Sequence, residues 1–292
     1  GAAHTACADA EVILAAGALA TPKIMMLSGL GPATHLAELG IPVVRDMPAV
    51  GADYQDHVAA PVYALTREPS SLLGQDRGWR ALRHGLEYTL FATGLLASTV
   101  VESGGFFDTD GDGRPDVQFH VLPVMIESAE HVTVGRHGME LNPCVLRPKS
   151  RGTVRLRSPD ARDPIRFTTG FLSHPGDIAT LLAGMKVARK ILRQPALQAV
   201  VKEELAPGAD DALPDEAIVD HILRHAKTVY HPSGTCRMGT DRDAVVDPEL
   251  RVRGVPGLRV CDASIMPRLT SGNTNAPAIM IGDRCADFIL GS

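Results

Sequence analysis

The stretch that decides the fold runs Glu11-Val-Ile-Leu-Ala-Ala-Gly17 and continues, after three small or apolar residues, with Thr21-Pro-Lys-Ile-Met-Met-Leu27. A compact apolar run with β-branched residues is typical of a short strand that is covered on both faces, and Gly17 ends it. Thr21 then offers a helix cap, with Pro22 at the first helical position. The order strand, turn, helix indicates an α/β unit.

The rest of the chain shows two further patterns. From about Ala59 to Arg224, short alternating segments punctuated by Gly, Pro and Asp predict an antiparallel sheet. The segments expected to be strands are 117–122, 139–146 and 152–156, with 245–252 and 258–260 nearer the C-terminus. Apolar residues at three- and four-residue spacing predict helices. These helices are expected at 33–39, 177–192 and 215–225, with a terminal helix that begins near Pro277.

The composition excludes several classes of protein. In 292 residues the formal net charge is -5 with acids and bases interspersed, which argues against a nucleic-acid partner. The longest apolar runs are interrupted well before the roughly 20 residues that a membrane span needs. Five cysteines without a CxxC pair suggest neither a disulfide framework nor a zinc site, so we expect a cytoplasmic protein and no bound metal. Because the first residue is Gly1 rather than Met, we expect this start to be a processing, nicking or cloning boundary.

Five blocks of sequence carry a family resemblance. Their order and spacing are hard to obtain by chance, and they are densest in the first 57 residues and in the last 65 or so. The blocks cover residues 17–31, 50–57, 230–239, 258–267 and 271–277. Together they resemble the glucose-methanol-choline (GMC) oxidoreductases, which are flavin-dependent enzymes. In the second block Asp53 and Tyr54 replace the more usual Asn and Leu, which is a mild departure.

The resemblance implies the chemistry of the site. Oxidation of an alcohol needs a base near the substrate hydroxyl while hydride passes to flavin N5, and His231 in the third block is the candidate base. Asn273 occupies the place of a second polar group, whose amide can donate to a developing alkoxide. A turn-forming Asn beside Gly272 is the structural alternative. For His57 we favour a structural, hydrogen-bonded histidine over a functional one.

The resemblance also implies a set of FAD contacts. The small-residue turn before the first helix, the end of the 258–260 strand and the start of the terminal helix are expected to approach the flavin and its pyrophosphate. The cofactor-binding residues are Ala16, Gly17, Thr21, Tyr230, Asp262, Ala263, Thr274, Asn275 and Pro277. One other pattern is discounted: the loop from Asp108 to Asp116 has the spacing of the start of a calcium loop, but Phe119 stands where an EF-hand needs Glu, so a polar hairpin loop is favoured.

The fold class implied is α/β, with part of a Rossmann-like FAD-binding domain and an antiparallel-sheet substrate domain. We expect residues 1–58 to be an FAD-domain segment, 59–225 the substrate-binding domain and 226–292 an FAD-domain segment with the catalytic histidine. The G-x-G-x-x-G fingerprint that binds the ADP half of FAD is absent. The missing N-terminal βαβ part is therefore expected on a separate or nicked chain, as a partner that activity requires.

Three functions stay open at this point. The first is FAD-dependent oxidation of a small-molecule alcohol, as a dehydrogenase or an oxidase. The second is a hydroxynitrile lyase, an activity that also occurs on this fold with a flavin that does no redox work, and the third is a non-catalytic fragment. The sequence does not name the alcohol, because the middle of the chain resembles the family only loosely. Its aromatic residues Trp79, Tyr88, Phe91 and Phe106 are candidates for a substrate-access loop or simply for core.

Overall fold

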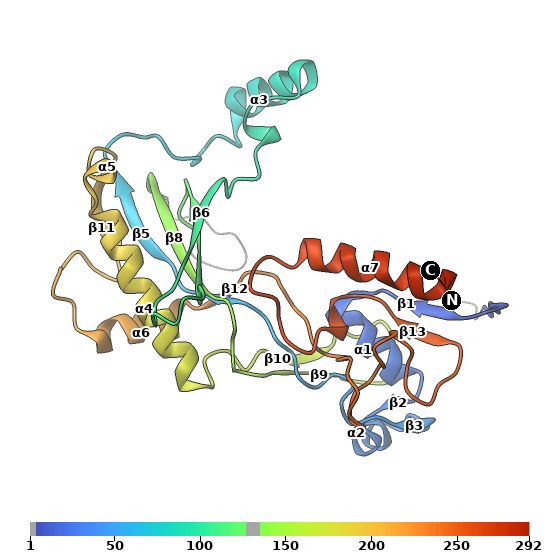
Figure 1. Ribbon diagram of the computed structural model, residues 1–292. Helices are drawn as coiled ribbons and strands as arrows, with labels where there is room; N and C mark the ends of the chain where they lie inside the picture. Colours follow the sequence, from blue (N-terminus) through green and yellow to red (C-terminus); the bar gives the residue numbers. More distant parts are fainter. Residues whose placement is uncertain (1–3, 127–134, 292) are drawn as a thin grey trace. The chain divides into compact units, whose positions relative to one another are not determined.

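The computed structural model describes residues 4–126 and 135–291, so Gly1 lies outside the described residues. Contacts between residues divide the chain into two compact units, each built from segments that are distant in the sequence (Figure 1). Unit 1 comprises Gly1–Asp56, Ser150–Ser173 and Tyr230–Ser292, and unit 2 comprises His57–Lys149 and His174–Val229. Segment 150–173, expected within the substrate-binding stretch, thus joins unit 1, because Val154 is fully buried in the core of that unit.

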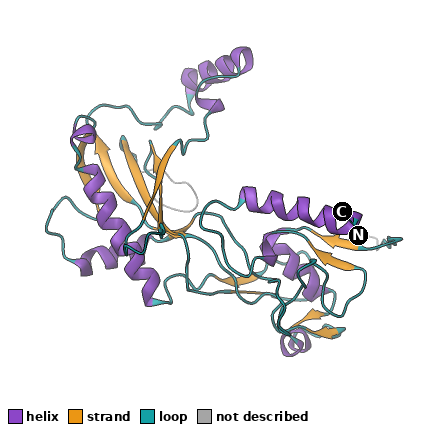
Figure 2. Cartoon of the chain, in the orientation of Figure 1, coloured by secondary structure: helices purple, strands orange, loops and turns teal. Residues whose placement is uncertain are grey.

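Unit 1 is an α/β assembly of short elements around one apolar core (Figure 2). A parallel pair, a second parallel pair and an antiparallel ribbon form its strands. These strands are β1 (Val12–Leu14) with β13 (Leu258–Val260), β2 (Leu30–Gly31) with β3 (Arg45–Asp46), and β9 (Thr153–Arg155) with β10 (Arg166–Thr168). The helices are α1 (Gly17–Leu27), α2 (Ala33–Glu38) and α7 (Asn275–Leu290), with a 3-10 turn η2 (Ala263–Ile265). Strand β13 and helix α2 confirm the sequence predictions.

Helix α1 begins at Gly17 rather than at Pro22, so the predicted start was wrong. Gly17 adopts a left-handed φ of +83°, and its N–H donates to Asp262 Oδ2 at 2.9 Å, 245 residues away. Pro22 therefore lies inside the helix, where it lacks an N–H for the carbonyl of Ala18. That carbonyl instead accepts the Thr235 hydroxyl at 2.6 Å. Two distant segments thus supply the cap and the replacement donor, which the local sequence could not reveal.

Strand β1 is more exposed than the apolar run predicts. Val12 is 49% and Ile13 is 44% exposed, although a strand in a parallel sheet is normally covered on both faces. Within the described residues β1 pairs with β13 alone, in the register Val12 opposite Leu258. The prediction of a strand is confirmed and the prediction of its burial is wrong for the part of the chain that the structure describes.

Unit 2 contains an antiparallel sheet of seven strands within the described residues. Strand β8 is central: β7 lies along one edge, with β6 beyond it, and β4 and β5 follow one another along the other edge. The outer strands β12 and β11 pair with β4 and β5. The bounds are β4 (Val58–Ala59), β5 (Val62–Thr66), β6 (Ser103–Phe107), β7 (Val117–Leu122), β8 (Gly138–Val145), β11 (Val201–Ala206) and β12 (Lys227–Thr228). The expected antiparallel sheet is confirmed.

Helix α4 (Pro175–Leu192) packs against one face of this sheet. The approach is close at Gly184, where a Cβ would lie 3.0 Å from Pro143 Cβ and 3.1 Å from Val117 Cγ1. Leu181 and Met185, from the predicted apolar stripe, are fully buried. The remaining helices of unit 2 are α3 (Gly78–Phe91), η1 (Leu95–Ala97), α5 (Pro195–Gln198) and α6 (Asp215–His225). The structure confirms α4 and α6, whereas α3 was not predicted.

Two further expectations differ from the structure. Residues 245–252 form isolated bridges, such as Val246 with Val252, rather than a continuous strand, because turns at 247–250 interrupt the extended chain. Helix α7 (Asn275–Leu290) begins two positions before Pro277, near which its start was expected. Among the described residues no helix is both long and apolar enough to cross a bilayer.

Candidate active site

The loop that carries His231 is fixed within unit 1 by backbone pairing. Ser233 and Gln55 exchange two backbone hydrogen bonds of 2.9 and 3.0 Å. The His231 N–H donates to Asp56 Oδ1 at 2.8 Å, and the other oxygen of this carboxylate accepts the Tyr54 hydroxyl at 2.9 Å. Asp56 is 3% exposed and His231 is 8% exposed. The imidazole is therefore held by a buried framework rather than by a mobile loop.

Asn273 lies directly against the imidazole of His231. Its Nδ2 is 3.3 Å from His231 Nε2. An amide nitrogen can only donate, so in this orientation Nε2 accepts and carries a lone pair. Burial lowers the pKa of His231 below its ordinary value, which favours the same neutral form. The two residues thus present a neutral imidazole base beside an amide donor, as general acid–base chemistry on a hydroxyl requires.

The residues expected to lie beside the cofactor meet at the start of α1. The Asp262 carboxylate accepts from the Gly17 N–H at 2.9 Å, from the Thr21 hydroxyl at 2.5 Å and from the Ser264 N–H at 2.8 Å. Thr21 Oγ1 in turn accepts from the Ala16 N–H at 3.1 Å. Thr21 and Asp262 therefore bind each other and shape the turn. A Cβ on Gly17 would meet no atom within 4 Å, so the space beside the turn is open.

A second group of expected cofactor residues lies around the active-site loop and the start of α7. Tyr230, directly before His231, is exposed and has a left-handed φ of +66°, an uncommon conformation that often marks functional sites. Ala263 accepts the Gly234 N–H at 3.2 Å and so ties η2 to the loop. Thr274 is the residue before α7 and gives no side-chain cap. The first N–H groups of α7 therefore receive no acceptor from that side chain. Asn275 and Pro277 stand in this first turn.

His57 lies in unit 2 and has a structural setting. Its side chain is fully buried, and Nε2 is 3.1 Å from the carbonyl oxygen of Leu146. Its own carbonyl accepts the Val229 N–H at 3.2 Å. This geometry agrees with the structural interpretation of His57.

Asp56 and Gln55 are site residues that sequence reasoning did not single out. Asp56 holds the His231 backbone, and Gln55 Oε1 accepts the Leu269 N–H at 3.1 Å, which joins the loop to the segment leading to Asn273. Both stand in the 50–57 block, where the adjacent polar residues after Gly51 are the signal that could have identified them. Asp53, in contrast, forms an ion pair with Arg237 at 3.3 Å.

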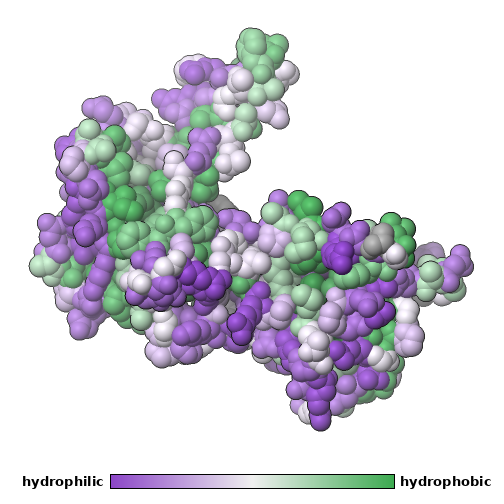
Figure 3. Space-filling view, viewed as in Figure 1, coloured by the Kyte–Doolittle hydropathy of each residue, from purple (hydrophilic) through white to green (hydrophobic). Residues whose placement is uncertain are grey.

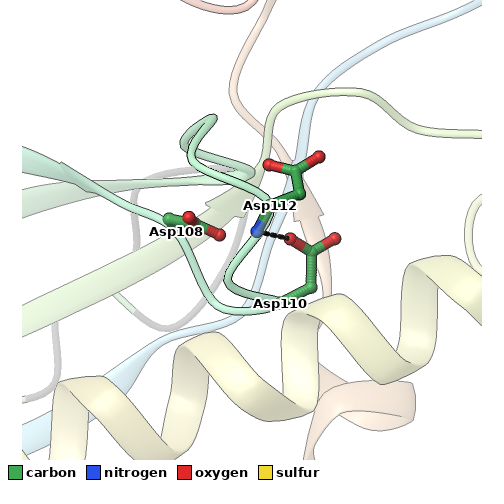
Figure 4. A group of neighbouring side chains, drawn as sticks. All are labelled: Asp108, Asp110 and Asp112. Carbon is green, nitrogen blue, oxygen red and sulfur yellow. Dashed lines mark hydrogen bonds between the residues drawn. The ribbon is translucent and has the colours of Figure 1, made fainter.

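The acidic loop of unit 2 has a local structural setting. Asp108, Asp110 and Asp112 lie close together, as Figure 4 shows, within 4.8 Å of one another. Their carboxylates accept backbone N–H groups of the same loop, including Gly111 and Gly113 on Asp108 at 2.7 Å each. The geometry is that of a hydrogen-bonded polar hairpin loop, as expected.

Comparisons with known proteins agree on a family. Two family models, both described as GMC oxidoreductase, match residues 1–59 and 148–282. An oxygen-dependent choline dehydrogenase of Burkholderia cenocepacia is 42% identical over 288 residues, 98% of this chain and 51% of that protein. An alcohol dehydrogenase [acceptor] of Pseudomonas putida is 43% identical over 286 residues, 96% of this chain and 51% of that protein.

The fold is also shared with solved structures. A mutant of the Aspergillus oryzae RIB40 formate oxidase, studied for its FAD modification, superposes with a TM-score of 0.88 at 25% identity. The alignment covers 97% of this chain and 54% of that one. The chain spans about half the length of the curated relatives it matches.

Proposed function

We propose that this chain, which belongs to the GMC oxidoreductase family, forms the C-terminal part of an FAD-dependent alcohol oxidoreductase. The observation that carries the proposal is the 3.3 Å contact between Asn273 Nδ2 and His231 Nε2 in a buried framework. Two relatives similar to this chain are named as a choline dehydrogenase and an alcohol dehydrogenase, so a small-molecule alcohol is the proposed substrate class.

His231 and Asn273 have complementary roles in the proposed reaction. His231 Nε2 takes the hydroxyl proton of the alcohol, and its neutral form at neutral pH follows from its lowered pKa. Asn273 donates a hydrogen bond to the oxygen as negative charge develops there. Bound FAD would supply the acceptor for the hydride. The imidazolium left on His231 then places a positive charge beside the site, where it stabilises negative charge nearby.

Other residues of this unit fit FAD. The turn at Ala16 and Gly17 is open, and Gly17 lacks a side chain that would hold a ring or phosphate away. The uncapped first turn of α7, at Asn275, presents N–H groups that favour an anionic or electron-rich group. Thr21 and Asp262 hold the turn in shape, and Tyr230, Ala263, Thr274 and Pro277 complete the proposed set.

An N-terminal portion of the same protein is the proposed partner for this cofactor site. The strand β1 shows apolar side chains on its surface, and α7 shows Ile279 at 66% and Met280 at 58% exposure. Such surfaces are typical of an interface that further structure covers. The ADP half of FAD needs a Gly-rich strand-to-helix turn, which we propose that this partner supplies.

Hydroxynitrile lyase activity and a non-catalytic role have less support than alcohol oxidation. The relatives named above are dehydrogenases and oxidases, and no feature of the pair favours hydroxynitrile lyase chemistry. A non-catalytic fragment has no chemical reason to keep His231 and Asn273 in contact. A cytoplasmic location remains our proposal, supported by the free state of all five cysteines.

The test is anaerobic stopped-flow reduction of the flavin by an alcohol, in protein that contains the complete flavin site. His231→Ala should keep its flavin spectrum and lose about 10²- to 10⁴-fold in the reduction rate, the range for loss of a general base. His4→Ala is the matched control, because His4 is exposed and remote in sequence from the pair. A His231→Ala variant that is reduced at the parent rate would refute the proposal.

A further inference from the structure

The segment that holds the backbone of His231 contains a buried tyrosine. Tyr54 and Gly152 exchange two backbone hydrogen bonds of 3.0 and 2.8 Å, and Gln55 pairs with Ser233 in the same way. In an extended segment alternate side chains point to the same side, so Tyr54 and Asp56 share one side and Gln55 takes the other. The Tyr54 hydroxyl is therefore within reach of the Asp56 carboxylate, and Oδ2 accepts it at 2.9 Å.

Packing fixes the ring of Tyr54, and burial fixes the state of its hydroxyl. Tyr54 is 3% exposed and belongs to the apolar core of unit 1. Its ring centroid lies 6.0 Å from that of Phe167 on β10, a contact distance for aromatic rings. Burial raises the pKa of Tyr54, and the charge of Asp56 and the hydrogen bond to it add to this effect. The hydroxyl therefore keeps its proton and donates from a fixed place.

The carboxylate that Tyr54 contacts holds a strained peptide. The N–H of His231 belongs to the peptide that follows Tyr230, whose left-handed φ of +66° is unfavourable for a bulky residue. Asp56 Oδ1 accepts this N–H at 2.8 Å and so stabilises the orientation of the peptide. Because the His231 side chain leaves the backbone at the next atom, this orientation sets where its Nε2 lies, 3.3 Å from Asn273 Nδ2.

We propose that Tyr54 is a positioning residue for His231 and acts through Asp56. Its hydroxyl binds Oδ2 and so limits rotation of the carboxyl group, which leaves Oδ1 directed at the His231 N–H. A donor to a buried carboxylate also stabilises the charged form, and a charged acceptor binds an N–H more strongly than a neutral one does. Leucine, the more usual residue of the family at position 54, has no donor for this task.

Tyr54→Phe is the variant that separates the hydroxyl from the ring, because phenylalanine keeps the packing in the core. Loss of one hydrogen bond to a charged group corresponds to about tenfold at the lower end of its range. The limiting rate of flavin reduction should therefore fall about tenfold. The dissociation constant of the alcohol should change by less than about twofold, since the lost support acts on the base during the reaction. This inference rests on the proposed role of His231 as the base.

The measurement is anaerobic stopped-flow reduction in protein that contains the complete flavin site. The complete protein is needed because α7 exposes Ile279 and Met280, within the hydrophobic surface that Figure 3 shows over the helix that Figure 1 labels α7. Val252→Ala is the matched control, as Val252 is 3% exposed in the same core cluster as Tyr54. It should lower the stability of unit 1 through a cavity and leave the reduction rate at the parent value.

A double-mutant cycle tests whether Tyr54 acts through Asp56. Asp56→Asn should slow reduction by about 10²-fold, because a small displacement of a reacting group has an effect of this size. The double variant with Tyr54→Phe should be no slower than Asp56→Asn alone, since residues that act through one another are not additive. Hydrogen exchange of the His231 amide should be faster in Tyr54→Phe and unchanged in Val252→Ala.

The outcomes that overturn the inference differ from those that refute the proposed function. A Tyr54→Phe variant reduced at the parent rate, in a protein that His231→Ala slows, overturns the inference alone. Losses that multiply in the double variant do the same, because Tyr54 would then act independently of Asp56. Loss of flavin from Tyr54→Phe but not from Val252→Ala would assign Tyr54 to folding only and also overturn it. A His231→Ala variant at the parent rate refutes the proposed function and this inference with it.

Discussion

Replacement of Asp262 by alanine should destabilise unit 1 by about 3–4 kcal/mol. The carboxylate accepts three hydrogen bonds, from Gly17, Thr21 and Ser264, at 2.5–2.9 Å. A hydrogen bond to a charged group contributes about 1.5 kcal/mol at the lower end of its range, which gives about 4.5 kcal/mol for three. Asp262 is only half-buried, so water replaces part of this loss.

Urea unfolding followed by circular dichroism measures the change, and hydrogen exchange of the α1 amides locates it. Asp262→Asn keeps one acceptor oxygen and should lose about half as much stability. Asp283→Ala is the control, because Asp283 is exposed on α7, and it should stay within about 0.5 kcal/mol of the parent. A loss below about 1 kcal/mol in Asp262→Ala, or unchanged exchange in α1, would refute the idea that this carboxylate caps the helix from a distance.

Three further outcomes are expected. Asn273→Ala should slow flavin reduction by about 10²-fold, a smaller effect than that of His231→Ala. Stopped-flow kinetics at equal flavin content measures this, and an unchanged rate would show that Asn273 takes no part in the reaction. Burial lowers the pKa of His231 from 6.5, so the imidazole should stay neutral down to a lower pH than a free histidine. The rate of flavin reduction should therefore fall only below pH 6.5. A fall centred above pH 6.5 would contradict the role of His231 as the base. The 292-residue chain expressed alone should aggregate and should not retain FAD after gel filtration. Co-expression with the N-terminal portion should give a protein that stays in solution and retains FAD. Stoichiometric FAD on the lone, monomeric chain would disprove this.

Elements defined by local periodicity were predictable from the sequence. The spacing of apolar residues predicted the bounds of α6, and the alternation of apolar and polar residues predicted β7. In both elements the residues of the segment itself decide which side is buried. The start of α1 was not predictable, since its cap is Asp262 and the donor that replaces the missing N–H of Pro22 comes from Thr235. Such contacts exist only once the chain has folded.

Helix α3 illustrates a different kind of failure. Its apolar residues do recur at helical spacing, but Gly78 and Gly85 and the Gly94 that follows weaken the helical signal, and the aromatic residues suggested core or an access loop. Trp79 and Phe91 are 68% and 69% exposed, so neither is core in the described structure. Burial could not be inferred, because it depends on partners outside the helix.

The residues that carry the chemistry of the candidate site were predictable, but the residue that holds His231 in place was not. The sequence blocks pointed to His231 and Asn273, which the structure brings into contact. Asp56 was missed because it binds the backbone N–H of His231, a group that every residue other than proline possesses and that no motif distinguishes. The roles assigned to the cofactor residues remain predictions.

The 245 residues that separate Gly17 from Asp262 also impose an order on biosynthesis. At roughly 5–20 residues per second, a ribosome needs roughly 12–50 s to add the cap after it has made the helix that requires it. Throughout that interval the first turn of α1 stays unsatisfied in the nascent chain. Unit 2 ends at Val229, before Asp262 has been translated, so it can be complete while unit 1 still waits for its last segment. The catalytic half of this chain is therefore the last to mature, and a chaperone that shelters its N-terminal segment would act during that delay.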